Sequence, residues 1–70
     1  MIEVKIDHVT VIMEYKVEEG DRVEKGDLVM MTEVMKMQEY FESPAKGRIH
    51  FVANLGDTVN EGDVLYRIEE

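Results

Sequence analysis

The sequence predicts an all-β protein with quasi-two-fold internal symmetry, and two observations carry this prediction. Apolar and polar residues alternate in short segments, and no segment shows the 3.6-residue apolar period of a helix. Residues 20–29 recur as residues 56–65, with five of ten positions identical and two more exchanging Leu for Val. The offset of 36 residues is about half of the 70-residue chain, so each half is expected to complete the other's sheet.

The individual strands follow from the alternation. Residues 2–6 alternate as a half-buried strand. Residues 9–17 alternate again, with Ile12 as the one apolar residue out of phase. Residues 28–31 are uncharged and apolar, which predicts a buried strand. Residues 38–42 form the next strand.

The second half ends its first strand at a proline. Pro44 cannot donate to a strand ladder, so Ser43-Pro44 is expected to end the preceding strand. Residues 49–55 alternate, with Leu55 in phase with Ile49, and residues 64–68 form the last strand.

Four Gly-Asp dipeptides mark the turns between these strands. Glycine supplies the positive φ that such turns often require, so the four glycines are expected to serve the fold. They are Gly20-Asp21, Gly26-Asp27, Gly56-Asp57 and Gly62-Asp63.

Lys36 lies at the middle of the chain and is the only cation between Lys25 and Lys46. Met35 and Met37 flank it, the apolar residues 28–31 precede it, and Tyr40-Phe41 follow. This layout suggests a β-hairpin that carries one amine at its tip. An offset of 36 from Lys36 falls just outside either chain end. The two-fold therefore predicts the tip at one pole and both ends near the other.

Composition excludes several classes of function. A chain of 70 residues buries only a small core, which leaves little room for a catalytic cleft. The absence of cysteine excludes thiol chemistry, disulfides and thiolate-bound zinc. A net charge of −8 argues against a nucleic-acid partner and favours solubility, with steering toward a basic partner as a second use.

The longest uncharged apolar run is far too short to span a membrane. The first residues enter strand-like alternation directly, without the pattern of a signal peptide. The expectation is therefore a cytoplasmic protein without a membrane partner, or a domain cut from a larger protein.

Met35-Lys36-Met37 resembles the biotin-attachment motif of biotin carboxyl carrier domains, within the wider biotinyl/lipoyl domain family. The paired Gly-Asp turns and Pro44, eight residues beyond the lysine, extend the resemblance from Val17 to Ile68. The family fold is the hammerhead, a flattened antiparallel β-barrel or sandwich of two four-stranded sheets. The resemblance implies that residues 1–70 form a single carrier domain of this fold.

The resemblance also implies the function. Lys36 is expected to be the covalent attachment site for biotin, added by a biotin protein ligase. The domain itself is expected to be non-catalytic and to shuttle carboxyl groups between biotin carboxylase and carboxyltransferase components. The alternative is lipoate on Lys36, in a lipoyl carrier or dual attachment protein serving a 2-oxoacid dehydrogenase-type complex. Met-Lys-Met favours biotin, because lipoyl domains commonly carry Asp-Lys-Ala.

This chain departs from the family pattern at two places. Val34 stands where Ala usually precedes Met-Lys-Met, and His8-Val9-Thr10 lacks the usual Pro-Gly strand start. No thumb-like insertion is present, so the sequence is most similar to the short, free-standing biotin/lipoyl attachment proteins.

The residues around Lys36 are candidates for recognition by the ligase: Glu33, Val34, Met35, Met37 and Glu39. The two methionines fit two roles equally well, packing under the turn and recognition by the ligase, and both roles can hold together. The two glutamates fit solvated turn charges better than a role in orienting the ligase. His8 and His50 lie on the polar phase of their strands without partners at metal-ligand spacing, so we expect surface residues and no metal site.

Overall fold

The computed structural model describes all 70 residues and contains eight strands and no helix. The strands form two four-stranded antiparallel sheets, in the orders β1-β8-β6-β3 and β5-β4-β2-β7. The bounds are β1 Ile2–Lys5, β2 Thr10–Tyr15, β3 Arg22–Val23, β4 Leu28–Val34, β5 Met37–Glu42, β6 Gly47–Phe51, β7 Thr58–Val59 and β8 Val64–Glu69. The predicted fold class is confirmed. No segment forms a long apolar helix of the kind that crosses a membrane.

The predicted two-fold is visible in the hydrogen bonds between the halves. The Gly20 amide donates to the Ile49 carbonyl, and the Gly56 amide donates to the Ile12 carbonyl. In turn, the Ile49 amide donates to the Asp21 carbonyl, and the Ile12 amide donates to the Asp57 carbonyl. The same relation makes β1, β2, β3 and β4 the counterparts of β5, β6, β7 and β8. Each sheet therefore combines strands from both halves of the chain.

The four Gly-Asp dipeptides form one repeated turn. In each, the aspartate amide donates to the carbonyl three residues earlier, at 3.0–3.1 Å. The aspartate carboxylate accepts from the amide of that same earlier residue at 2.8–3.2 Å. The glycines have φ between 85° and 92°, as a type II turn requires at its third residue. The prediction that these glycines adopt positive φ is confirmed.

The core lies between the sheets and includes Ile12, which is fully buried. The prediction that Ile12 is out of phase was wrong, because Val9 and Met13 are the exposed residues at 55% and 46%. A β-bulge explains the reversal: strand pairing passes from Ile12 to Glu14 and leaves Met13 as the extra residue. Beyond the bulge the inward phase shifts by one residue.

Two further apolar residues lie outside the core, contrary to their sequence pattern. Leu28 is 39% exposed at the start of β4, and Leu55 is 56% exposed in the turn before Gly56. Ser43, in contrast, is buried directly after β5, and Pro44 follows outside the strand as predicted.

Aromatic side chains connect the two sheets. Tyr15 of β2 stacks on Phe51 of β6 with centroids 3.8 Å apart, and Phe51 meets Tyr66 of β8 edge to face. Tyr66 is fully buried and donates its hydroxyl to the Glu42 carbonyl at the end of β5. Burial raises the pKa of the Tyr66 phenol to about 12.

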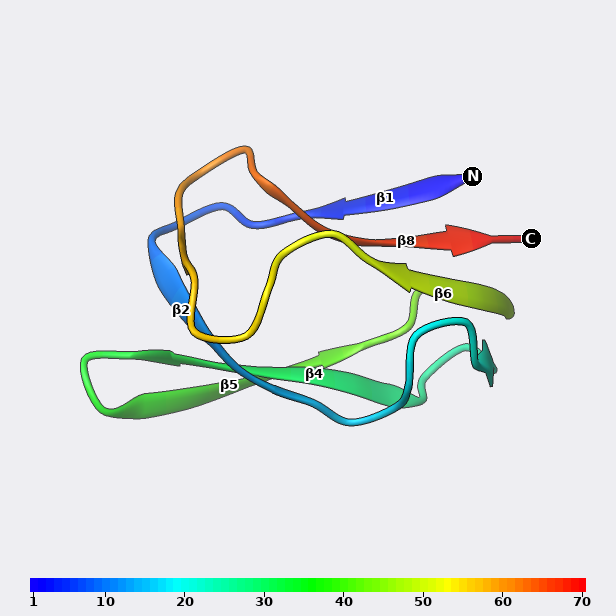
Figure 1. Ribbon diagram of the computed structural model, residues 1–70, viewed down its shortest axis with the longest axis horizontal. Helices are drawn as coiled ribbons and strands as arrows, with labels where there is room; N and C mark the ends of the chain where they lie inside the picture. Colours follow the sequence, from blue (N-terminus) through cyan, green and yellow to red (C-terminus); the bar gives the residue numbers. More distant parts are fainter.

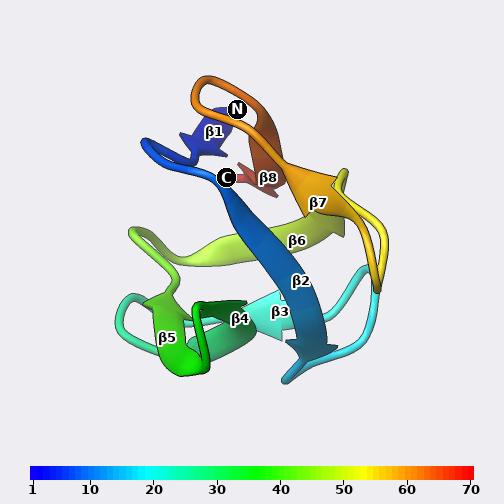
Figure 2. The ribbon, with the colours of Figure 1, turned by 90° about the vertical axis from the view of Figure 1, so that its left-hand side faces the viewer.

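The long axis of the molecule runs from the β4–β5 turn to the chain ends. The molecule measures 32 × 20 × 17 Å, and Figure 1 shows the turn at one end and both termini at the other. Viewed toward the turn, β4 and β5 lie on the opposite side of the molecule from β1 and β8 (Figure 2). The predicted placement of the hairpin and the termini at opposite poles is confirmed.

Gly47 is a glycine whose importance the sequence did not predict. A Cβ at this position would lie 2.5 Å from the Glu69 carbonyl oxygen and 2.8 Å from Ile68 Cγ2. Gly47→Ala should therefore lower the free energy of unfolding by about 1–3 kcal/mol, because the neighbouring strand must move. The melting temperature should fall by roughly 4–8 °C for each kcal/mol.

The matched control is Gly26→Ala, where an added Cβ meets no atom within 4 Å and only the positive φ is penalised. Thermal unfolding followed by circular dichroism compares the two. A melting temperature for Gly47→Ala equal to that of the parent would show that β6 and β8 do not need this close approach.

Candidate functional site: the Lys36 hairpin

The hairpin that carries Lys36 is built by six residue pairs between β4 and β5, ending at Val34 and Met37. Met35 and Lys36 form its two-residue turn, with φ of 48° and 69°. Positive φ at both central residues is the mark of a type I′ turn, whose twist matches that of the flanking strands. Neither residue is Gly, Asn or Asp, so the turn holds backbone strain of order 1–3 kcal/mol per residue.

Lys36 is exposed at this tip, and no carboxylate lies within ion-pairing distance of its amine. Met35 and Met37 are 92% and 73% exposed. The packing interpretation of the methionines was therefore wrong: alternation stops at the turn, and neither side chain lies beneath it. The tip presents one amine between two exposed thioethers.

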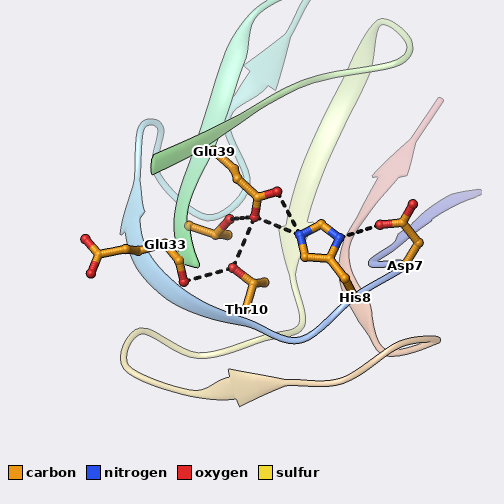
Figure 3. Close-up of polar contacts among 6 residues, drawn as sticks. Asp7, His8, Thr10, Glu33 and Glu39 are labelled. Atoms are coloured by element: carbon orange, nitrogen blue, oxygen red, sulfur yellow. Dashed lines mark hydrogen bonds and ion pairs between the residues drawn. The ribbon is translucent and has the colours of Figure 1, made fainter. Parts of the chain in front are cut away.

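Glu33 and Val34, both half-buried, end β4 directly before the turn. Glu33 pairs with Val11 of β2 and with Gln38 of β5. Its backbone carbonyl accepts the Thr10 hydroxyl at 3.1 Å, while its carboxylate points away from that contact (Figure 3). The structure thus places Met35 beside Lys36 in the turn, with Val34 and Met37 as the pair that closes it and Glu33 one pair further back.

Glu39 is not the solvated charge expected from the sequence. It pairs with Thr32 across the hairpin, and its Oε1 accepts the Thr32 hydroxyl at 3.0 Å. The same oxygen lies 3.2 Å from the Thr10 hydroxyl of β2 (Figure 3). Both threonines are buried, so Glu39 reaches inward across three strands.

His8 completes this contact from the connection between β1 and β2. Its Nε2 lies 2.9 and 2.7 Å from the two Glu39 oxygens, and its Nδ1 contacts Asp7 (Figure 3). Hydrogen bonds to these two carboxylates raise the pKa of the His8 imidazole. The bond to His8 holds the pKa of the Glu39 carboxyl below its usual value.

His50 forms a similar arrangement on β6, with Nδ1 2.8 Å from Glu19 and Nε2 2.9 Å from Glu69. Those two hydrogen bonds, with Glu69 the larger cause, raise the pKa of the His50 imidazole. Both histidines are partly exposed, and no three His, Cys, Asp or Glu residues form a group that could hold a metal ion.

Sequence reasoning missed both histidine contacts, because Glu39 and Glu19 each lie 31 residues from their partners. The internal repeat could have predicted that the Glu39 side chain faces inward. Ile12 and Ile49 make equivalent hydrogen bonds, so residues before the bulge correspond at an offset of 37 instead of 36. At that offset Glu39 corresponds to Ile2, an inward-facing residue.

No cavity opens beside Lys36. The hollow in the surface lies between the start of β6, β3 and the C-terminal end, and its lining includes Arg22, Lys46 and Arg48. The tip therefore has no enclosed site for a substrate of its own. Its arrangement suits the presentation of an amine to the active site of another protein.

Comparison with known proteins gives the family. The Biotin_lipoyl family model, described as "Biotin-requiring enzyme", matches residues 2–68. The propionyl-CoA carboxylase alpha chain of Mus musculus is 37% identical over 60 residues, and pyruvate carboxylase of Staphylococcus aureus is 38% identical over 60 residues. Each alignment covers 84% of this chain but only 8% and 5% of the relatives.

A solved structure, described as a single-chain, multi-domain long-chain acyl-CoA carboxylase, shares the fold. It aligns with a TM-score of 0.80 and 24% identity over 99% of this chain and 7% of its own. The chain thus spans less than a tenth of the length of these proteins. The match over residues 2–68 shows that the chain belongs to the Biotin_lipoyl family, the family of biotinyl and lipoyl attachment domains.

Proposed function

We propose that this chain is a biotin carboxyl carrier domain and that Lys36 is its attachment site. The observation that carries the proposal is the position of Lys36: an exposed amine in a two-residue turn, at the pole opposite both termini (Figure 1). Membership of the family supports it, as do the names of the relatives, which are carboxylases that act on acyl-CoA or pyruvate.

The residues at the tip fit a covalently attached biotin. Lys36 has no ion-pair partner to displace, and the two exposed methionines leave its approach open. The ligase would deprotonate the amine, which attacks the carbonyl carbon of a biotinyl adenylate. A C–N amide bond forms, the bond to phosphate breaks, and AMP and a proton leave.

The attached biotin would supply a ureido nitrogen that takes up and releases a carboxyl group. The chain's own contribution is placement. The tip holds the arm at one pole, so that the pole bearing the termini is free for linkage to partner proteins. Tethering raises the effective concentration of the carried group at each partner site. These partners would be a biotin carboxylase and a carboxyltransferase, and the domain itself would catalyse neither reaction.

Replacing Lys36 with arginine tests the attachment site. Lys36→Arg should fold normally and take no label from biotin ligase, ATP and biotin, because a guanidinium stays protonated and is a poor nucleophile. Peptide mass spectrometry locates the label in the parent. The matched control is Lys46→Arg, an exposed lysine at the other pole, which should be labelled at the parent's rate.

Label on Lys25 or Lys46 with Lys36 unmodified would sink the assignment. A parallel reaction with lipoate and a lipoate ligase separates the two cofactors. Modification of Lys36 by lipoate alone would replace the biotin proposal with the lipoyl alternative.

Exchanging two neighbouring residues tests whether position, more than composition, makes Lys36 the target. The double change Met35→Lys with Lys36→Met keeps the same atoms and charge but moves the amine to the other central residue of the turn. Adjacent Cα atoms are about 3.8 Å apart, and a misplacement of about 1 Å can cost roughly 100-fold in rate. We expect initial biotinylation to slow by at least about 100-fold.

Circular dichroism confirms that the exchanged protein folds, and the ligase concentration is held fixed. A labelling rate within a few-fold of the parent would mean that the tip is too mobile for its register to matter.

A further inference from the structure

The base of the Lys36 hairpin holds a polar cluster where the other half of the chain is apolar. We define the tip cluster as His8, Thr10, Thr32 and Glu39 (Figure 3). The two-fold shows how unusual its composition is. Thr32 pairs with Glu39 at the hairpin pole, and Ile68 pairs with Ile2 at the opposite pole.

Thr10 has a counterpart as well. It contacts the Glu33 carbonyl through its hydroxyl, whereas Gly47 approaches the equivalent Glu69 carbonyl with no side chain. Thus two isoleucines and a glycine at one pole are replaced by a glutamate and two threonines at the other. Placing a carboxylate on an inward face costs free energy unless it is hydrogen-bonded and paired. Every buried polar side chain here has a partner.

Backbone pairing leaves the hairpin end weakly held. Pairing between β2 and β4 stops at Val11 and Glu33. Beyond that point only the Val34–Met37 pair and the two-residue turn extend past β2. A two-stranded end without a neighbouring strand is marginally stable in water, so side-chain contacts at its base must fix its direction.

The tip cluster supplies those contacts. Glu39 lies on β5, three residues after Lys36, and its carboxylate meets Thr32 on β4 and Thr10 on β2. His8 reaches the same carboxylate from the connection that leads back to β1, in the other sheet. Resting on the proposed function, we propose that His8 and Glu39 are positioning residues, which fix the Lys36 hairpin against both sheets for the ligase and later for the carboxylase sites.

The two carboxylate contacts of His8 together require a charged imidazole. A neutral imidazole has one N–H and can donate to only one of its two carboxylates, Glu39 on β5 and Asp7 on its own connection. The threonines that face Glu39 are neutral, and the Glu33 carboxylate points away (Figure 3). Because the His8 pKa is raised, the full contact is present below about pH 6.5, the ordinary histidine value. It is lost as pH rises through the raised value.

The Glu39 carboxylate has the opposite pH dependence to His8. The pKa of Glu39 is lowered, so its contribution is present above its ordinary value and is lost as pH falls through the lowered one. The hairpin should therefore be held best in mildly acidic to near-neutral solution.

The first experiment measures the tip directly in the unmodified protein. Backbone ¹⁵N order parameters at Lys36 and Met37 should fall in His8→Ala from about 0.85 toward about 0.6. His50→Ala is the matched control, because it removes an imidazole that also bridges two carboxylates but lies on β6. Its tip order parameters should equal the parent's. A rigid tip in His8→Ala would overturn the proposal whether or not Lys36 is ever modified.

The second experiment measures biotinylation from pH 5.5 to 9. The ratio of parent to variant kcat/KM cancels the titrations of the ligase and of Lys36. For His8→Ala the ratio should be at least about fivefold at the acid end and should fall as His8 deprotonates. Glu39→Gln keeps an oxygen for both threonines but cannot form the ion pair, so it should show the same pH-dependent loss.

The outcomes separate the two proposals. A parent that takes no biotin refutes the carrier function, and the order parameters still decide the positioning role. A labelled parent with a ratio near 1 at every pH, or with equal losses in His8→Ala and His50→Ala, overturns the positioning role and leaves the carrier function intact.

Discussion

The fold depends on the exchange of backbone hydrogen bonds between the two halves of the chain. Each Gly-Asp turn donates its glycine amide to a backbone carbonyl of the other half and accepts a bond from the same residue in return. A segment of about 35 residues has too little apolar surface to fold by itself. Neither half can therefore form its sheet alone, and the 11-residue core exists only where the two meet.

This reciprocity leaves one pole free for specialisation. Pairing with β2 fixes β4 up to Glu33, and the β4–β5 hairpin then extends past the end of β2 by one residue pair and the turn. Both turn residues, Met35 and Lys36, have left-handed backbone conformations, which cost free energy in residues other than glycine. Such strain often occurs where one side chain must be held in position, which accords with the attachment role proposed for Lys36. Glu39, which faces inward at the hairpin base, is also a less favourable choice for stability than the isoleucine, Ile2, at the equivalent place on the other pole.

Sequence reasoning predicted the features that depend on local chemistry or on the exact repeat. The Lys36 hairpin, the four positive-φ glycines and the placement of both termini opposite the tip all followed from residues read in order. The errors share another origin. The bulge at Met13 reversed the inward phase and hid the burial of Ile12, and no local pattern marks a bulge.

The contacts of the tip cluster were hidden for the same reason. His8 and Glu39 are 31 residues apart in sequence, and they meet only because β2 and β5 both pair with β4, which brings the connection before β2 close to Glu39. Gly47 was overlooked because its constraint is a close approach of the neighbouring strand and not a turn. Met35 is exposed because it lies in the turn, and Met37 because its pair with Val34 lies past the end of the pairing with β2, and strand alternation could anticipate neither.

The two-fold relation also bears on how such a domain can be joined to other chains. The pair β1–β8 is the counterpart of the β4–β5 hairpin and differs from it in lacking a covalent turn. The molecule thus has one closed hairpin and one open hairpin at opposite ends of its long axis (Figure 1). Because the ends of the open hairpin lie side by side, a host chain can enter and leave there through adjacent strands. The domain can therefore be inserted within a protein, or appended to either of its ends, while the amine remains directed away from the junction.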